Sequence, residues 1–322
     1  MNMKHSGKKA LSVILSVCML LSLLPAMTIG ALAAGGTVKV GNESTPAATA
    51  YTGTGWSWTP AAGSTPGTLT LSGVNLTSAG ILLTCDANLV LEGANYISGS
   101  VTSSGYTAAI YSSGALTVGG SGTLKIAPGS FQFGIYASSL TFNSGYIDVS
   151  VNYSSHPNAI YSTSTTGITV NGGYISATAV GTQATCLYAP NSIAINGGYV
   201  TASASSSDMD LCRAVWVQSG TVTVSGGYLE VTKGSHGILA YNGVTNSGGV
   251  IKSTGCSTFG IMTTYNSLNC TGGVTIASGT SQAIFGNIAG GNSENLYSNV
   301  GGTLTTPGTG LSTAATTSAL KG

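Results

Sequence analysis

The sequence predicts an all-β fold, and within that class a single-stranded right-handed parallel β-helix of about nine to ten coils with three short strands in each coil. Two observations lead to this prediction. The stretch ITVNGGYISATA at residues 168–179 returns 25 residues later as IAINGGYVTASA at residues 193–204. The composition is also that of strands, because Val, Ile, Thr and Tyr are frequent while only 5% of the residues are charged. A β-helix repeats because one coil cannot bury its own apolar side, so that each coil covers the next.

The repeat can be aligned over most of the chain. Each unit carries an aliphatic residue followed, in most units, by an aromatic one, at intervals of 23 to 29 residues. The aligned pairs are Ile81-Leu82, Ile110-Tyr111, Ile135-Tyr136, Ile160-Tyr161, Leu187-Tyr188, Val215-Trp216, Ile238-Leu239, Ile261-Met262 and Ile284-Phe285. Within a unit a short strand such as GIYAS is followed by a second strand such as SLTFN, a glycine turn, a third strand such as GYIDVSV and a variable loop. This order is what one coil of a parallel β-helix requires.

Alternation of apolar and polar residues assigns the side chains to the inside or the outside of each coil. The second and third strands each place two aliphatic columns inside. These columns are Leu140, Ile168, Ile193, Val222 and Leu268; Phe142, Val170, Ile195, Val224 and Cys270; Ile147, Ile175, Val200, Leu229 and Ile251; and Val149, Ala177, Ala202 and Val231. We expect them to form the core, with coils about 4.8 Å apart.

Polar turn residues close the second strand of each unit, often as Asn-Gly-Gly. Asn and Gly tolerate the left-handed backbone that a tight turn needs. The stacked coils place these residues above one another, as Asn143, Asn171, Asn196, Ser225, Ser247 and Thr271. We expect a structural ladder of hydrogen bonds along the axis.

The N-terminus has the features of a signal peptide. Residues 1–33 carry a basic head with Lys4, Lys8 and Lys9, an apolar run, and the small residues of Ala31-Leu32-Ala33. We therefore expect a secreted, extracellular protein, at most loosely associated with the cell surface. The rest of the chain has six basic and eight acidic residues. Nucleic acids and anionic lipids bind clustered Lys and Arg, so neither is expected as a partner, and no membrane contact beyond the signal peptide is expected.

The repeat also divides the remaining chain. Residues 34–79 are expected to hold the N-terminal cap and the first coil, with Trp56 and Trp58 covering the open end of the core. Residues 80–287 hold the parallel β-helix repeats. Residues 288–322, in which the pattern fades, are expected to hold a C-terminal cap and a flexible tail.

Two columns of aromatic residues are predicted on the outside. The first is Tyr111, Tyr136, Tyr161, Tyr188 and Trp216; the second is Tyr146, Tyr174, Tyr199 and Tyr228. We expect exposed columns, because the neighbours of inward residues point outward. Aromatic faces stack on the apolar faces of sugars, so the nine side chains are candidate carbohydrate-binding residues for an extended glycan. A purely structural role stays open, since Tyr is a good strand residue and stacked columns stabilise neighbouring strands.

Enzymes with the same architecture, such as pectate lyases and polygalacturonases, need clustered charged residues on one face. Asp148 and Glu230 occupy equivalent outward positions three coils apart, which places them roughly 14 Å apart, too far for a paired-carboxylate mechanism. Asp208 and Asp210, near Arg213, are the one candidate calcium pair, a weak match in a Ser-rich loop. We therefore predict no enzyme and no cofactor other than this candidate calcium.

The five cysteines beyond the signal peptide give no disulfide framework, because their number is odd. Cys186 and Cys212 lie near matching coil edges and are the pair that an exported protein could bridge. Cys270 falls in an inward column and is expected to be a small core residue.

Several sequence segments resemble those of a known family. GWSW, TLTLSGVNL, GIYAS, LTVGGSGTLKI and ITVNGGYISA are similar to the carbohydrate-binding-domain family of secreted parallel β-helix proteins in Gram-positive, largely anaerobic and gut, bacteria. The resemblance covers nearly all of the chain after residue 33. It implies non-catalytic binding of a polysaccharide or cell-surface glycan, and calcium in acidic loops, for which eight scattered acidic residues give little material. The alternatives are a cell-surface adhesin or structural solenoid with a protein partner and, third, a polysaccharide lyase or hydrolase.

Overall fold

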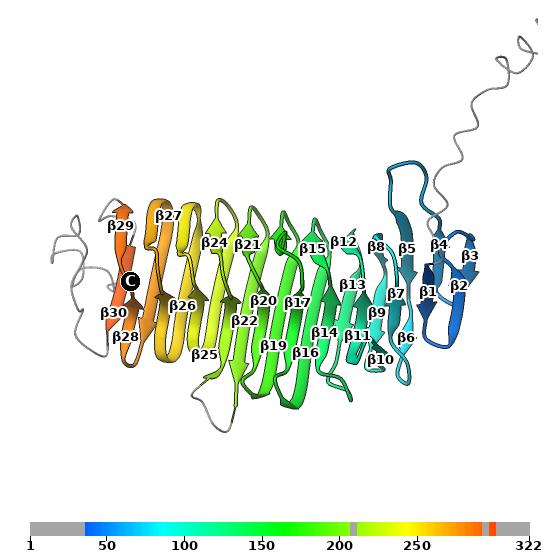
Figure 1. Cartoon of the computed structure of the whole chain (residues 1–322), viewed down its shortest axis with the longest axis horizontal. Helices are drawn as coiled ribbons and strands as arrows, with labels where there is room; N and C mark the ends of the chain where they lie inside the picture. Colours follow the sequence, from blue (N-terminus) through cyan, green and yellow to red (C-terminus); the bar gives the residue numbers. More distant parts are fainter. Residues whose placement is uncertain (1–35, 207–210, 292–295, 301–322) are drawn as a thin grey trace, which may run out of the picture.

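The structure, a computed structural model, describes residues 36–206, 211–291 and 296–300. Over these residues the chain is all-β and forms a parallel β-solenoid of about 8 turns, stacked along the long axis of the molecule (Figure 1). The predicted parallel β-helix with three strands in each coil is confirmed, but its about 8 turns are fewer than the nine to ten coils that the sequence predicted. Within the described ranges no helix is long and apolar enough to cross a bilayer. The predicted signal peptide and the last residues of the predicted tail lie outside the described residues.

Each coil contributes one strand to each of three columns. The first column holds β7 (Ile81–Leu83), β11 (Tyr106–Ser112), β14 (Phe133–Ala137), β17 (Asn158–Ser162), β20 (Thr185–Ala189), β23 (Arg213–Val217) and β28 (Gln282–Phe285). The second holds β5 (Gly67–Ser72), β8 (Ala87–Glu92), β12 (Ala115–Gly120), β15 (Ser139–Phe142), β18 (Ile168–Val170), β21 (Ser192–Ile195), β24 (Thr221–Val224) and β29 (Ile288–Gly291). The third holds β6 (Asn75–Leu76), β9 (Ala94–Ile97), β13 (Thr123–Ile126), β16 (Tyr146–Ser155), β19 (Tyr174–Thr182), β22 (Tyr199–Ser205) and β30 (Leu296–Val300). Three long strands pass from one column to the next: β25 (Tyr228–Ala240), β26 (Val244–Thr263) and β27 (Leu268–Gly279).

The pairing reproduces the predicted register. Ile110 pairs with Ile81 on one side and Ile135 on the other, and the series continues through all the aligned pairs to Ile284. The predicted inward columns are buried in one continuous core. Val244 fills the place between Val222 and Leu268 that the sequence alignment left empty. The repeat therefore sets both the register and the core.

The last described coils depart from the aliphatic pattern. Ile251 pairs with Thr275, and the Thr275 side chain is fully buried. Its hydroxyl accepts a hydrogen bond of 2.9 Å from Asn246 Nδ2, and Cys270 Sγ donates to it at 3.4 Å. A buried hydroxyl costs little when it is hydrogen-bonded, so this exception does not interrupt the stack.

The predicted polar ladder is confirmed from Asn143 to Ser225. Asn171 donates to the side-chain oxygen of Asn143 at 2.9 Å, Asn196 donates to Asn171 at 3.0 Å, and Ser225 donates to Asn196 at 2.9 Å. Each amide thus satisfies the next along the axis, which is the structural role that the sequence predicted.

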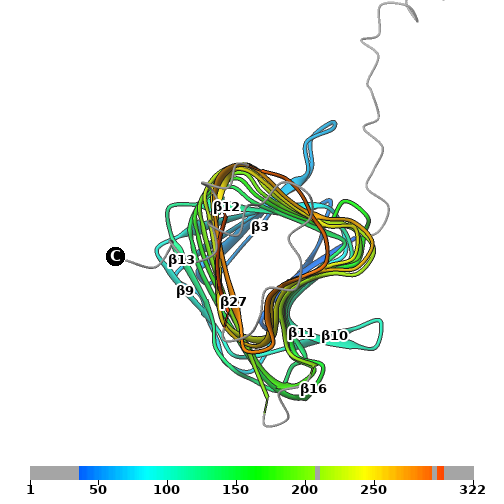
Figure 2. The ribbon, with the colours of Figure 1, turned by 90° about the vertical axis from the view of Figure 1, so that its left-hand side faces the viewer.

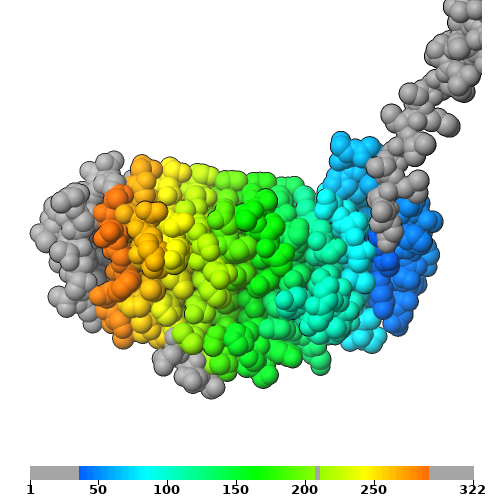
Figure 3. All heavy atoms as spheres, viewed as in Figure 1, coloured from blue at the N-terminus to red at the C-terminus, as the bar shows by residue number. Residues whose placement is uncertain are grey.

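Antiparallel hairpins cap the N-terminal end of the core. β1 (Thr37–Val40) pairs with β2 (Glu43–Pro46) and β7, and β3 (Tyr51–Gly53) pairs with β4 (Trp56–Thr59), which pairs with β5. Trp56 and Trp58 are buried there, as predicted. Their indole nitrogens donate to Glu43 Oε2 at 2.7 Å and to the Ala47 carbonyl at 2.9 Å. The loop between β4 and β5 projects from this end of the molecule (Figure 3).

A column of small residues bends the coil inward along the first strands, on the side where β11 lies in the end view (Figure 2). The residue before each aligned aliphatic is Gly, Ala or Cys: Gly80, Ala109, Gly134, Ala159, Cys186, Ala214, Gly237, Gly260 and Ala283. A Cβ at Gly134 would lie 2.3 Å from Val149 Cγ1. Since both members of each small-aliphatic pair are inside, the residues that flank the pair, such as Phe133 and Tyr136, both lie outside the core.

Candidate functional site

The first aromatic column is a stack of parallel rings. The ring centres of Tyr111 and Tyr136 are 4.8 Å apart, those of Tyr136 and Tyr161 are 5.3 Å apart, and those of Tyr161 and Tyr188 are 4.5 Å apart. The ring planes differ by 7 to 11°. Parallel strands in register therefore place one ring directly on the next, and each ring covers the faces of its neighbours.

The predicted exposure of this column is wrong for three of its members. Tyr111, Tyr136 and Tyr188 are only 4, 8 and 8% exposed, while Tyr161 and Trp216 are half-buried. Burial follows from the stacking and from Phe133, whose ring meets Tyr136 and Tyr161 edge-on at 5.2 and 4.9 Å. Alternation places these side chains outside the core, but outside the core is not the same as exposed to solvent.

A hairpin that the sequence analysis missed covers the start of the column. β10 (Val101–Ser103) pairs antiparallel with β11, and this hairpin stands out from the coil outline in Figure 2. Its turn uses Ser104 and Gly105 at positive φ, 51° and 82°. Tyr106 lies on Tyr136 with ring centres 5.1 Å apart. The 29-residue interval between the first two units is the signal that could have revealed this insertion.

Burial of the column makes stability at high pH a test of this arrangement. Burial, together with Tyr111 and Tyr106, raises the pKa of Tyr136 from 10.0 to about 12. The folded protein holds the Tyr136 hydroxyl proton more tightly than the unfolded chain does. The protonated hydroxyl therefore contributes its full share to the free energy of unfolding below pH 10, and this contribution is lost as the pH rises through about 12. We expect the free energy of unfolding, measured in urea, to fall between pH 10 and pH 12, and to fall less steeply in Tyr136→Phe. Equal slopes in the two proteins would show that Tyr136 is not buried.

The second column is also stacked, but it is more open to solvent. Tyr146, Tyr174, Tyr199 and Tyr228 have ring centres 4.7, 5.2 and 4.8 Å apart and planes within 2 to 8° of each other. Tyr146 is 46% exposed and the other three are half-buried. The expected array of outward ring faces is therefore wrong for the inner members, because each inner ring has both faces against other tyrosines. The column presents a row of ring edges to the outside.

A charged pair lies beside the C-terminal part of the second column. Glu230 pairs in register with Thr201 and Lys252, and Lys252 Nζ lies 2.9 Å from Glu230 Oε1. The Tyr199 hydroxyl donates a hydrogen bond to Glu230 Oε2. The bonds from Tyr199 and Lys252 lower the pKa of Glu230 below its usual value. Glu230 is thus an ionised acceptor that orients Tyr199.

Trp216 ends the stack of the first column. Its ring is turned by 70° from that of Tyr188, at a centre-to-centre distance of 4.9 Å. The guanidinium carbon of Arg213 lies 4.3 Å from the centre of the Trp216 ring. His236 pairs with Arg213 in the next coil. The sequence showed each residue separately, but not that the inward bend brings Arg213 and Trp216 together.

The two outward carboxylates that the sequence offered for a paired mechanism, Asp148 and Glu230, are not brought together. Asp148 is linked to Glu230 through Ser176 and Thr201 in successive coils, which confirms the predicted separation of three coils. The candidate calcium ligands Asp208 and Asp210 lie outside the described residues. Among the residues that are described, no three His, Cys, Asp or Glu side chains gather closely enough to hold a metal ion.

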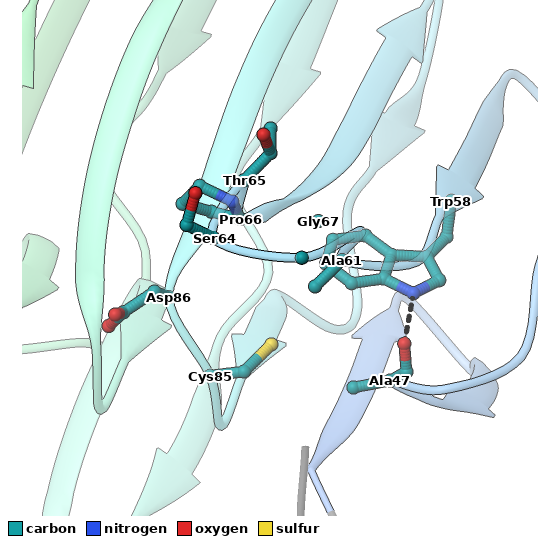
Figure 4. A pocket seen from close by; sticks show the side chains of 10 residues that line it. Ala47, Trp58, Ala61, Ser64, Thr65, Pro66, Gly67, Cys85 and Asp86 are labelled. Atoms are coloured by element: carbon teal, nitrogen blue, oxygen red, sulfur yellow. Dashed lines mark hydrogen bonds between the residues drawn. The ribbon is translucent and has the colours of Figure 1, made fainter. Parts of the chain in front are cut away.

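Sequence reasoning also missed a small cavity at the N-terminal cap (Figure 4). Its volume is about 230 Å³, and Trp58, Pro66, Cys85 and Asp86 are among its lining residues. Asp86 Oδ1 accepts a hydrogen bond of 2.8 Å from the Ala115 backbone, and the Trp58 indole is bonded to Ala47. Both polar groups thus have structural partners, and the volume is below the range of pockets that enclose a drug-sized ligand.

Four of the five cysteines after residue 33 are buried, and Cys85 is half-buried. Cys186 carries a free thiol, so the bridge to Cys212 that the sequence left open is absent. Burial raises the pKa of the Cys186 thiol to about 12, which disfavours the reactive thiolate. Cys270 is buried in its predicted inward column.

Comparison with known proteins adds one finding. A family model described as "Carbohydrate-binding domain-containing protein" matches residues 66–289, which span the solenoid from β5 to β29. No curated protein and no solved structure matches the chain.

Proposed function

Because the chain belongs to the family of carbohydrate-binding domain-containing proteins, we propose that it is a secreted, non-catalytic protein that binds an extended polysaccharide or cell-surface glycan along the solenoid axis. One observation carries the choice of surface. The second aromatic column is a straight row of equivalent side chains 4.7 to 5.2 Å apart. An extended β-1,4-linked glycan advances by a similar length per sugar, so that successive sugars would meet equivalent tyrosines.

The stacking determines how sugars would bind. Inner rings offer edges and hydroxyl groups, and a phenol hydroxyl both donates and accepts hydrogen bonds. Tyr146 ends the row and pairs in register with Thr123 of the preceding coil, so its outer face is the one on which a sugar ring would stack. We propose a binding mode of one stacking contact and a series of hydroxyl contacts along the row.

The arrangement of charged residues supports binding without catalysis. Glycoside hydrolysis uses two carboxyl groups within about 10 Å on either side of the bond. Asp148 and Glu230 are three coils apart, and both Glu230 oxygens are already bonded to Lys252 and Tyr199.

The first test is a binding screen of residues 34–322 against soluble and insoluble polysaccharides, with calcium and with a chelator, while released sugar is assayed. We expect retention on at least one polysaccharide, no release of sugar, and no effect of the chelator. Release of reducing or unsaturated sugar would contradict a non-catalytic role. Retention on no glycan would favour the adhesin or structural solenoid with a protein partner.

A further inference from the structure

Arg213 is the only arginine of the sequence, and it lies on the outer side of β23 against Trp216. The guanidinium carbon is 4.3 Å from the centre of the indole ring, within the range of a cation–π contact. Burial lowers the pKa of Arg213, but a guanidinium remains charged in proteins at neutral pH. The first aromatic column therefore ends in a half-buried cation.

This cation is not neutralised by the part of the chain that the structure describes. The one ion pair within residues 36–206 and 211–291 joins Lys252 to Glu230. Arg213 Nε is buried and has no hydrogen-bond partner among the described residues. A planar guanidinium fork matches the two oxygens of a carboxylate or sulfate group, and such charge-assisted bonds are stronger than neutral ones.

The neighbours of Arg213 complete the polar surroundings that a sugar requires. The Ser235 hydroxyl donates to the Cys212 carbonyl at 2.8 Å, so its oxygen accepts from His236 Nδ1, 2.9 Å away. Burial and Arg213 lower the pKa of His236, which keeps the ring neutral at pH 7. A neutral ring that is protonated at Nδ1 has a lone pair on Nε2, which can accept a bond from a sugar hydroxyl.

We propose that Arg213, Trp216 and His236 form a subsite for an anionic sugar residue, whose carboxylate or sulfate group pairs with the guanidinium while its ring contacts the half-buried indole. This subsite rests on the proposed function, because it lies on the first column of a polysaccharide-binding solenoid. It narrows the ligand class to acidic polysaccharides, such as those that contain uronate or sulfated residues.

The test compares polysaccharides that share a backbone and differ in charge. Affinity electrophoresis of residues 34–322 is run in gels that contain polygalacturonate or its methyl ester, and in gels that contain carboxymethyl cellulose, cellulose sulfate or neutral hydroxyethyl cellulose. We expect binding to at least one anionic member to be ten-fold or more tighter than to its neutral counterpart. Comparing the binding to carboxymethyl cellulose with the binding to cellulose sulfate shows whether the carboxylate or the sulfate group is preferred.

Two variants test whether a preference for anionic polysaccharides comes from Arg213. Arg213→Gln should reduce the ratio of anionic to neutral binding to about one, whereas Lys125→Gln, which removes an exposed cation from β13, should leave the ratio unchanged. Circular dichroism checks that both variants are folded. A charge preference that survives Arg213→Gln overturns the subsite. A preference for anionic polysaccharides that appears only in the variant Asp208→Asn/Asp210→Asn also overturns the subsite. The two carboxylates would then be the partners of Arg213 in the unmodified protein.

The outcomes also separate the subsite from the proposed function. Equal binding of neutral and anionic polysaccharides by the unmodified protein refutes the subsite and leaves polysaccharide binding intact. Retention on none of the gels by a protein that binds another, neutral polysaccharide in the binding screen refutes the subsite alone. Retention on no polysaccharide in either experiment refutes both.

Discussion

Replacement of Ile160 by Asp should lower the free energy of unfolding by more than about 5 kcal/mol. Ile160 is fully buried in the middle of the core and pairs with Ile135 and Leu187 in the adjacent coils. Loss of a large aliphatic side chain costs about 2 to 5 kcal/mol, and an unpaired buried carboxylate costs several more. In a solenoid each coil contacts only its neighbours, so the defect should also separate the coils on its two sides. Urea unfolding should then show two transitions instead of one.

The matched control for Ile160→Asp places the same charge in the same coil but outside the core. Thr166 is exposed in the turn between β17 and β18, so Thr166→Asp should change stability by no more than about 0.5 kcal/mol. Limited proteolysis locates the weak point: cleavage near residues 155–170 is expected only in Ile160→Asp. Stability of Ile160→Asp within about 1 kcal/mol of the unmodified protein would contradict the core position of Ile160.

The solenoid could be predicted from sequence because its determinants are local and periodic. The alternation within one unit places Ile160 inside the core, and the same alternation in the next unit places its partner Leu187 there. The features that the sequence did not show interrupt the period. The hairpin of β10 and β11 is an insertion. A cap before β5 was expected, but its antiparallel pairing was not, because this segment has no second copy to align with.

The candidate site was less predictable, for a different physical reason. Alternation along a strand decides on which side a side chain lies, but not what covers it or how its ring is turned. Tyr136 points away from the core, as predicted, yet it is covered by Tyr111, Tyr161 and Tyr106. The contact of Arg213 with Trp216 depends on the small-residue bend at Ala214, which moves both residues to one side.

Loss of the open end of the second column should have the largest effect on glycan binding. In Tyr146→Ala/Tyr174→Ala the exposed terminal ring and the ring beneath it are removed, while the bonds of Glu230 to Tyr199 and Lys252 are kept. If each ring contributes about 1 kcal/mol or more to binding, affinity for the best polysaccharide of the screen should fall roughly ten- to a hundred-fold. Isothermal titration with an oligosaccharide of that polysaccharide measures the change.

A second pair of tyrosines provides the control for this experiment. Tyr241 and Tyr265 are also exposed and also in contact, with ring centres 4.3 Å apart, but they belong to neither column. Tyr241→Ala/Tyr265→Ala removes the same chemical groups and should leave affinity within about two-fold. Equal losses in the two double variants would mean that tyrosines bind sugar wherever they are exposed. No loss in the folded Tyr146→Ala/Tyr174→Ala variant would mean that the second column only holds neighbouring coils together, and the glycan site would then have to lie elsewhere, with the Arg213 end of the first column as the next surface to test.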